Sequence, residues 1–225
     1  FCDEIVTINK EDYRRAKKMH APSVRYIHGI GVDTKRLQKS KEQSDIRKEL
    51  ELKKDDFLVL SVGELNANKN HKVIIQALAR LNDSSIHYLI CGKGDLLNEL
   101  QELAKKNHMD KNVHFLGYRN DVMDICSQAD LFAFPSYREG LGLAALEAMY
   151  TALPLITSNI RGSVDFMENG KTGYICSPDD SGAFAAAIKK MKKHVSLRMQ
   201  MGENNKRIVN RYCLENVKKE VLKLF

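Results

Sequence analysis

The sequence predicts an α/β fold in which a parallel, Rossmann-like sheet is covered by helices on both faces. Apolar runs of strand length alternate with helical patterns along most of the chain, and such continuously apolar strands are typical of sheets that are buried on both faces. The 225 residues are 43% hydrophobic and 29% charged, with 13 Gly and 4 Pro, a composition that excludes disordered and collagen-like chains.

The predicted main domain covers residues 34–225. Its strands are expected at residues 57–63, 86–91, 113–116, 131–134, 154–157 and 174–176. Its helices are expected at residues 72–81, 95–106, 141–150, 181–193, 196–211 and 214–224. The intervening stretch 35–51 is charged and only weakly periodic, so its sequence predicts no regular element.

Residues 1–33 do not fit the pattern of the main domain. They predict a strand at 4–8, a helix at 10–19 and a strand at 24–28, before Gly29-Ile30-Gly31 breaks the pattern. A lone strand-helix-strand piece cannot bury its own faces, so we expect it to pack on the main domain or on a missing partner. We interpret it as the end of an N-terminal acceptor domain plus a hinge.

Positive charge is concentrated near the C-terminus. The net charge is +7, and residues 189–225 hold eleven Lys or Arg against three Glu. The favoured interpretation is a solvated helix surface, since no aromatic interleaving accompanies the charges, and we predict no nucleic-acid partner. The alternatives are a nucleic-acid binder that uses this stretch, and peripheral contact with an anionic membrane.

The cysteines and the hydropathy point to the cytoplasm. The five cysteines are far apart and form no Cys-x-x-Cys pair, so a zinc ribbon and a disulfide framework are not predicted. No apolar run approaches the roughly 18 residues of a membrane span. We therefore expect a cytoplasmic protein, with the inner face of the plasma membrane as its one candidate peripheral site.

The most informative segment follows the predicted strand 131–134. A loop containing Gly140 and Gly142 opens a helix there, and the first-turn amides of a helix, with its dipole, favour an anion. Glycines leave room for a phosphate to approach the backbone. The segment therefore predicts a phosphate-binding turn.

Two carboxylates accompany that turn. Between Gly140 and Tyr150 the only charged residue is Glu147, and burying its carboxylate is costly unless a partner such as a pair of sugar hydroxyls satisfies it. Glu139 stands eight residues earlier, near whatever is attached to the far phosphate. The alternative is that Glu147 pairs with a core arginine or a backbone amide and that Glu139 is solvated.

Two other strand ends carry weaker signals. Lys69 lies in an Asn-rich turn before a helix, where it would neutralise phosphate charge or, alternatively, be an ordinary surface lysine. Gly92-Lys93-Gly94 lacks the third glycine of a dinucleotide fingerprint, and Asp95 is a candidate helix cap.

Several common sites are missing from the sequence. It contains no Walker A motif, no His-Glu-x-x-His, no Gly-x-Ser-x-Gly and no Asp-x-Asp pair that would clamp a metal on a diphosphate. The seven histidines are scattered, and His87 and His114 lie in predicted strands, where a structural role is favoured. Neutralisation of a diphosphate would therefore fall to Lys69 and to helix amides.

At these residues the chain resembles the C-terminal, donor-binding half of a retaining GT-B glycosyltransferase of family 4, the glycosyl transferases group 1 type. The Glu139-x7-Glu147 spacing is the strongest match. Residues 115–122 are similar to the family's nucleobase strand and loop, and residues 28–33 to its interdomain linker. Residues 160–165 and 169–174 match downstream loops, so the resemblance runs nearly end to end.

The resemblance implies transfer of a sugar from a UDP-linked nucleoside-diphosphate donor, with retention, to a growing bacterial cell-surface or exopolysaccharide glycan. It implies that Glu139 contacts the donor sugar and that Lys69 stabilises the departing diphosphate. It implies no cofactor and no divalent metal. The donor-binding positions that it implies are Gly63, Glu64, Gly92, Gly117, Tyr118, Gly140, Leu141, Gly142, Leu143 and Glu147.

Two departures from the family pattern affect these expectations. Many members carry arginine where this chain has Glu64, so Lys69 is the only cation of that loop or Glu64 pairs with it. The acceptor half, expected before Phe1, is absent, so we expect the chain to bind a nucleotide sugar but to transfer little by itself. The glycan or lipid-linked acceptor would bind the missing domain.

Two alternatives share the predicted fold. One is a nucleotide-sugar-binding subunit without transferase activity, which the Glu64 departure favours and the intact Glu139 and Glu147 pair disfavours. The other is a nucleotide-sugar epimerase.

Overall fold

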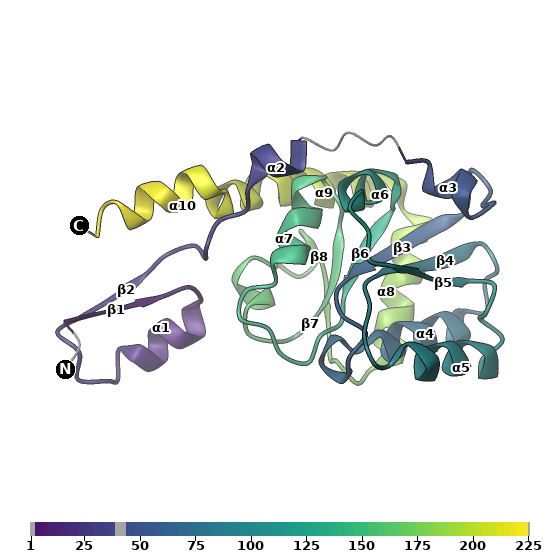
Figure 1. The fold of residues 1–225 in the computed structure, drawn as a ribbon, viewed down its shortest axis with the longest axis horizontal. Coiled ribbons are helices and arrows are strands. Elements are labelled where there is room, and N and C mark those ends of the chain that lie inside the picture. The colour runs from purple at the N-terminus through teal and green to yellow at the C-terminus, as the bar shows by residue number, and fades with distance from the viewer. Residues whose placement is uncertain (1–2, 39–43, 225) are drawn as a thin grey trace.

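The computed structural model describes residues 3–38 and 44–224 and contains a six-stranded sheet whose strands are all parallel (Figure 1). The strand order is β5-β4-β3-β6-β7-β8. The order reverses between β3 and β6, which is where doubly wound sheets bind their ligands. The strands are β3 (Phe57–Val62), β4 (Ile86–Cys91), β5 (Val113–Gly117), β6 (Leu131–Phe134), β7 (Leu155–Ser158) and β8 (Gly173–Cys176).

Helices cover both faces of this sheet, which confirms the predicted fold class (Figure 1). One face packs on α4 (His71–Leu81), α5 (Leu97–Lys106) and α8 (Ser181–Lys193). The other face packs on α3 (Ile46–Glu49), α6 (Val122–Gln128) and α7 (Leu143–Tyr150), and α9 (Val195–Val209) contacts both α7 and α8. Successive strand residues alternate between the faces, so Val59 belongs to the first core and Leu60 to the second.

The sequence pattern misses the shortest elements. Among the described residues, α2 (Thr34–Gln38) and α3 lie almost wholly in the stretch that predicted no element. The described residues also form three 3-10 helices: η1 (Ala67–Lys69), η2 (Ser163–Asp165) and η3 (Asn210–Tyr212). Long-range contacts fix α3, because the Ile46 side chain is fully buried and its N–H donates to Gln128 Oε1 at 3.0 Å. The expectation that Asp95 caps α5 is wrong, since Leu96 holds the N-cap position without a side-chain hydrogen bond.

The N-terminal segment forms a small unit of its own beside the large sheet (Figure 1). β1 (Glu4–Thr7) and β2 (Ser23–Tyr26) pair in parallel, joined by α1 (Lys10–Ala16), and α10 (Leu214–Val221) runs past them. The His28 backbone N–H and Nδ1 lie 2.9 Å and 2.8 Å from the Glu220 carboxylate. The expectation that this unit packs on the main domain is thus confirmed, whereas its assignment to a preceding domain stays a prediction.

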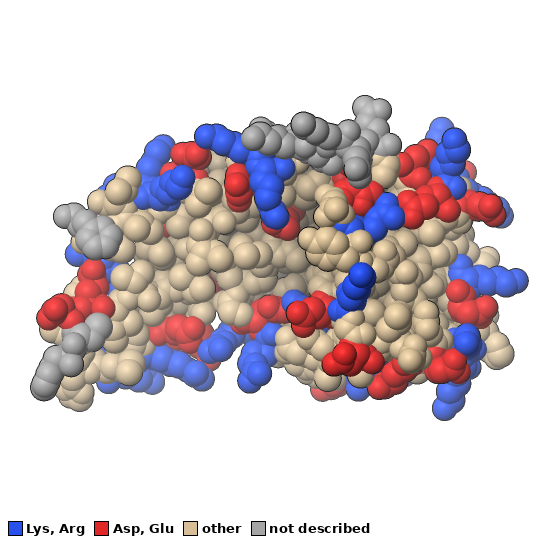
Figure 2. Space-filling model, viewed as in Figure 1, with Lys and Arg blue, Asp and Glu red and all other residues tan. Residues whose placement is uncertain are grey.

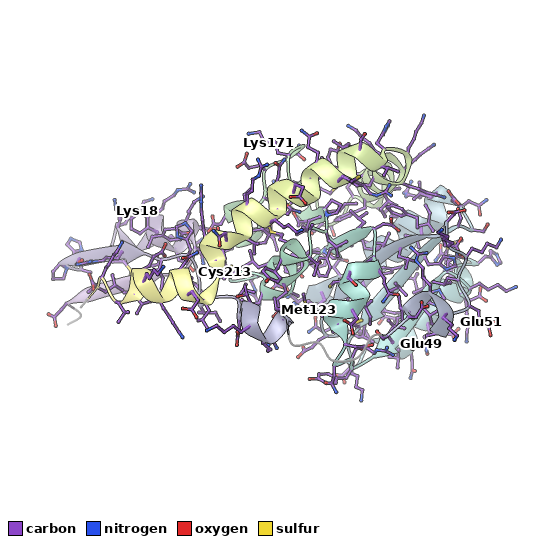
Figure 3. The ribbon with its side chains drawn as sticks, turned by 90° about the horizontal axis from the view of Figure 1, so that it is seen from above. Lys18, Glu49, Glu51, Met123, Lys171 and Cys213 are labelled. Atoms are coloured by element: carbon purple, nitrogen blue, oxygen red, sulfur yellow. The ribbon has the colours of Figure 1, made fainter. Side chains whose placement is uncertain are left out.

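The chain segment that leaves the small unit lies beside the segment that leads into α10. Val32 N–H donates to the Tyr212 carbonyl at 2.7 Å, and Leu214 N–H donates to the Val32 carbonyl at 2.9 Å. Figure 3 labels Cys213 at this junction, where α9 gives way to α10. A Cβ atom on Gly31, whose φ is +90°, would lie 2.7 Å from Leu214 Cα. Glycine is therefore required where the two segments meet.

The basic C-terminal stretch is partly compensated by acidic partners. Lys192 Nζ lies 2.6 Å from Asp83, and Arg198 Nη2 lies 3.2 Å from Asp130. On the face shown in Figure 2, acidic and basic side chains are interspersed. Within the described residues, no helix has both the length and the apolar character needed to cross a bilayer.

The cysteines of the described residues carry free, buried thiols: Cys91, Cys126, Cys176 and Cys213. Cys2 lies outside the described residues. Burial raises the pKa of Cys91 to about 12, so this thiol stays protonated at neutral pH.

A buried polar chain ties three strands together beneath the site. His71 Nδ1 lies 2.9 Å from the Tyr88 hydroxyl, and His71 Nε2 lies 3.2 Å from the Glu64 carbonyl. The Tyr88 hydroxyl donates to Ser61 Oγ at 2.9 Å, which donates to the Ala133 carbonyl at 2.6 Å. Burial lowers the pKa of His71 from 6.5 to about 4, so the folded protein holds this ring neutral at neutral pH.

The two strand histidines also have structural contacts. His87 Nδ1 lies 3.1 Å from His114 Nε2, and His87 Nε2 lies 3.4 Å from Asp56. Burial lowers the pKa of both rings, that of His114 to about 4. The expected structural role of both histidines is therefore supported.

Acidification is expected to destabilise the fold. The unfolded chain binds a proton at residue 71 below pH 6.5, whereas folded His71 binds it only near pH 4. The stability that the neutral ring contributes is therefore fully present above pH 6.5 and is lost as the pH falls toward 4. His71 alone would lower the free energy of unfolding by about 3 kcal/mol across that window. Urea unfolding at a series of pH values measures this.

The matched variants are His71→Gln and His194→Gln, the latter at an exposed position. The first should flatten the pH dependence of the free energy of unfolding, while His87 and His114 leave a residual slope. The second should leave the slope as it is. Equal slopes in wild type and His71→Gln would contradict the assignment.

Candidate functional site

A cleft of about 360 Å³ opens where the carboxyl ends of β3 and β6 meet. This is the point of strand-order reversal, so the cleft lies where the fold predicts a ligand. Its walls come from the loops after β3 and β6, from the start of α7 and from the small N-terminal unit. The lining residues are Ile8, Ile30, Lys69, Phe134, Glu139, Leu141, Gly142, Leu143 and Ala144.

Lys69 and Glu139 form an ion pair in the wall of this cleft. Their Nζ and Oε1 atoms are 2.7 Å apart, and their side chains are only 22% and 15% exposed. Lys69 Nζ also lies 5.5 Å from the centre of the Phe134 ring. Both alternatives raised above, a surface lysine and a solvated Glu139, are therefore wrong.

The position of Lys69 is set by its own loop. Asn66 accepts the Lys69 backbone N–H at 3.0 Å, capping η1. A Cβ atom on Gly63 would lie 3.0 Å from Lys69 Cε. Gly63 thus lets the lysine stem lie close to the end of β3, which directs the ammonium group toward Glu139.

The loops after β3 and β6 are hydrogen-bonded to each other. Asn68 Nδ2 donates to the Arg138 carbonyl at 2.9 Å, and Tyr137 N–H donates to the Asn68 carbonyl at 2.8 Å. Asn70 Nδ2 donates to the Pro135 carbonyl at 3.1 Å. These bonds hold the segments that carry the lysine and the carboxylate in one fixed arrangement.

The start of α7 presents backbone donors beside that pair. Gly142 occupies the N-cap with φ +83°, and a Cβ atom there would lie 2.9 Å from the Phe134 ring. Among the described residues, no acceptor contacts the N–H groups of Leu143 and Ala144. A Cβ atom on Gly140 would meet nothing within 4 Å. The turn is therefore open to an anion, as the sequence predicts.

Glu147 lies two turns further along α7 and is paired with an arginine. Its carboxylate contacts Arg36 of α2 directly, with 22% of the Glu147 side chain and 66% of the Arg36 side chain exposed. Burial raises the pKa of Glu147, and the charge of Arg36 opposes that shift. The alternative of an arginine partner for this carboxylate is therefore confirmed in part, since the partner is an exposed arginine and not a core one.

Glu64 and Gly92 lie at strand ends outside the cleft lining. Glu64 is exposed and accepts from Asn66 Nδ2 at 2.9 Å, so the expected alternative of a Glu64–Lys69 pair is wrong. A Cβ atom on Gly92 would lie 1.8 Å from the Gly63 carbonyl oxygen. Glycine is thus required at position 92 by the packing of two loops, whether or not a ligand binds.

The loop after β5 exposes an aromatic side chain and is held in place by an arginine. Gly117 has φ +66° and Tyr118 is 74% exposed. Arg119 holds the loop with two bonds to Glu49, at 2.8 Å and 2.9 Å, and a contact of 2.6 Å to Asp121. Hydrogen bonding from Arg119 lowers the pKa of Asp121 to about 2. Figure 3 labels Glu49 on α3, a helix that contacts α6.

The structure brings only part of the predicted set together. Five predicted residues line the cleft: Lys69, Glu139, Leu141, Gly142 and Leu143. The sequence reasoning missed Ile8 and Ile30 as lining residues and Arg36 as the partner of Glu147. Arg36 and Glu147 are 111 residues apart, and no local pattern signals contacts over such separations.

Comparisons with known proteins agree with this arrangement. The family model described as Glycosyl transferases group 1 matches residues 42–208. EpsD of Bacillus subtilis (strain 168) is 32% identical over 231 residues, which cover 100% of this chain and 61% of EpsD. The UDP-Gal:alpha-D-GlcNAc-diphosphoundecaprenol alpha-1,3-galactosyltransferase of Escherichia coli is 30% identical over 200 residues, which cover 86% of this chain and 51% of that protein. The chain thus spans only part of the length of these relatives.

Solved structures show the same fold. Anabaena Alr3699/HepE in complex with UDP has a TM-score of 0.90 at 20% identity, over 100% of this chain and 64% of that one. WaaG, a glycosyltransferase involved in lipopolysaccharide biosynthesis, has a TM-score of 0.80 at 23% identity, over 97% of this chain and 61% of that one. The expected GT-B type of architecture is confirmed.

Proposed function

Because the chain belongs to the glycosyl transferases group 1 family, we propose that it is the donor-binding part of a retaining glycosyltransferase of the family 4 type. The donor is a nucleoside-diphosphate sugar, UDP-linked, and the acceptor is a bacterial cell-surface or exopolysaccharide glycan, free or lipid-linked. The single observation that carries this proposal is the half-buried Lys69–Glu139 pair beside the open N-terminal turn of α7.

The chemistry of each group supports its assigned role. A nucleoside diphosphate carries charge that the α7 amides and dipole stabilise. Lys69 lies in the same cleft and stabilises the charge that develops on the diphosphate as the glycosidic bond to the sugar breaks. Glu139 accepts hydrogen bonds from the sugar. With these groups supplying the positive potential, we propose that transfer needs no divalent metal.

The nucleoside is assigned to residues outside the cleft lining, on α7 and on the loop after β5. Glu147 accepts hydrogen bonds from the two ribose hydroxyls. Arg36 moves out into solvent when the ribose binds, since its side chain is mostly exposed. The base lies on Gly117 and Tyr118, whose loop Arg119 holds. The names of the relatives support the choice of base and product, since one is a UDP-Gal-dependent galactosyltransferase and another a capsular polysaccharide biosynthesis glycosyltransferase.

A nucleotide-sugar-binding subunit without transferase activity is the second candidate. The observation that favours it is Glu64, which pairs with Asn66 and stands where many family members have a second cation. The intact Lys69–Glu139 pair favours the transferase. Transfer by the full-length protein, with the anomeric configuration of the product followed by NMR, decides between the candidates and tests retention.

Titration of the chain with UDP and with GDP is the direct test of donor binding. We expect saturable UDP binding by calorimetry, with GDP at least about tenfold weaker, which corresponds to about 1.4 kcal/mol. Inorganic phosphate at the same concentrations serves as the control for nonspecific anion binding. Failure of both nucleotides to bind, or equal heat from phosphate, would contradict the proposal.

A further inference from the structure

Asn9 reaches from the small N-terminal unit into the glycine turn of the site. Its side chain is 1% exposed, and its Nδ2 donates to Asp12 Oδ2 at 2.7 Å and to the Gly140 carbonyl at 3.3 Å. Its Oδ1 accepts the Asp12 backbone N–H at 2.8 Å. Only one orientation of the amide satisfies all three contacts, because both Nδ2 partners are acceptors.

A small rotation of the peptide bond between Gly140 and Leu141 changes the direction of a backbone N–H group beside the cleft. The peptide bond is planar and trans, so the N–H of Leu141 points opposite to the Gly140 carbonyl. Fixing the carbonyl therefore fixes the direction of the Leu141 amide, and Leu141 lines the cleft. A Cβ atom on Gly140 would meet nothing within 4 Å, so nothing packs against the side of this residue where a side chain would stand.

A second segment supports the same turn from another element. A Cβ atom on Gly162, whose φ is +88°, would lie 3.0 Å from both the Glu139 and the Gly140 carbonyl oxygens. Lys10 N–H, next to Asn9, donates to Asp165 Oδ2 at 2.7 Å, which ties the start of α1 to this second segment. The turn that follows Glu139 is thus held between the β1–α1 connection and the loop after β7.

We propose that Asn9 is a positioning residue of the donor site, which orients the 139–142 turn toward the diphosphate. This inference rests on the proposed function and assigns to the small unit a share in donor binding. The small unit also contributes Ile8 and Ile30 to the cleft wall. Asn9 acts through the Gly140 peptide, so its loss should affect the phosphates of a ligand and spare the nucleoside.

Two substitutions separate this role from helix capping. Asn9→Ser keeps an N-cap acceptor for Asp12 N–H but is too short to reach Gly140. Asn9→Asp keeps the shape and the cap but places an acceptor against the Gly140 carbonyl. Arg25→Gln is the matched control, because Arg25 ties the same unit to Glu4 and to the Lys223 carbonyl, away from the site.

The test compares the affinities of the chain for UDP and for uridine by calorimetry. We expect both Asn9 variants to bind UDP about fivefold or more weakly, the equivalent of one hydrogen bond, with uridine within about twofold of wild type. Arg25→Gln should match wild type for both. Unchanged UDP affinity in the Asn9 variants, or equal losses for UDP and uridine, overturns the inference alone. Wild-type chain that binds neither ligand overturns the proposed function and this inference with it.

Discussion

Replacement of Lys69 by alanine is expected to lower the rate of sugar transfer by the full-length protein about 100-fold or more. Lys69 is the cation within reach of Glu139, at 2.7 Å, and removal of one such preorganised group from an active site typically costs that much in turnover. In the proposed function the ammonium stabilises the departing diphosphate, so the loss should be in kcat more than in KM.

Ligand binding provides a second reading of the same variant. UDP carries one phosphate more than UMP, so Lys69→Ala should weaken UDP binding and leave UMP binding within about twofold. Lys72→Ala is the control, an exposed lysine of α4 three residues away. Glu139→Gln should retain UDP affinity while transfer falls, because its carboxylate is assigned to the sugar. Full transfer activity in Lys69→Ala would contradict the proposed role of the lysine in stabilising the diphosphate.

Replacement of Glu147 by alanine is expected to weaken UDP binding at least about tenfold, or about 1.4 kcal/mol. The proposed function assigns to Glu147 one or two charge-assisted hydrogen bonds with the ribose hydroxyls, and the variant would lose them. The variant leaves Arg36 without this carboxylate, but that side chain is 66% exposed and stays solvated. Calorimetric titration with UDP measures the loss, and Glu102→Ala, an exposed helical carboxylate paired with Lys105, is the control.

Arg36 distinguishes the two interpretations of this carboxylate. If ribose hydroxyls and the guanidinium compete for Glu147, Arg36→Gln should bind UDP at least as tightly as wild type. If the Arg36–Glu147 pair serves only the fold, both variants should lower the free energy of unfolding and neither should change UDP affinity. The latter result would contradict the assignment of the ribose hydroxyls to Glu147.

The sequence was sufficient for the large sheet and for several residues that line the cleft. Buried parallel strands are apolar along their whole length, so runs such as residues 57–62 stand out without an alignment. Glu147 stands out for the opposite reason, as one charge in an otherwise apolar helix. Short helices such as α2 and α3 are different, because long-range contacts, not periodicity, stabilise them.

Pairings across the chain could not be predicted from local patterns. Lys69 and Glu139 were each identified, but their contact joins residues 70 positions apart. Asn9 and Gly140 are 131 positions apart, and Asn9 on its own reads as a helix cap, which it also is. A residue with a local role and a distant one shows only the local role in the sequence.

The bridge between the chain segments at Val32 and Cys213 restricts how the small unit can move relative to the large sheet. Both connections run together, with main-chain hydrogen bonds of 2.7 Å and 2.9 Å between them. A rotation of the small unit about this line would keep both of those bonds, but it would break the Asn9–Gly140 hydrogen bond of 3.3 Å and the Lys10–Asp165 hydrogen bond of 2.7 Å. Ile8 and Ile30 line the cleft together with Lys69, so the contacts of Asn9 and Lys10 with the large domain, and not the junction alone, set the width of the opening.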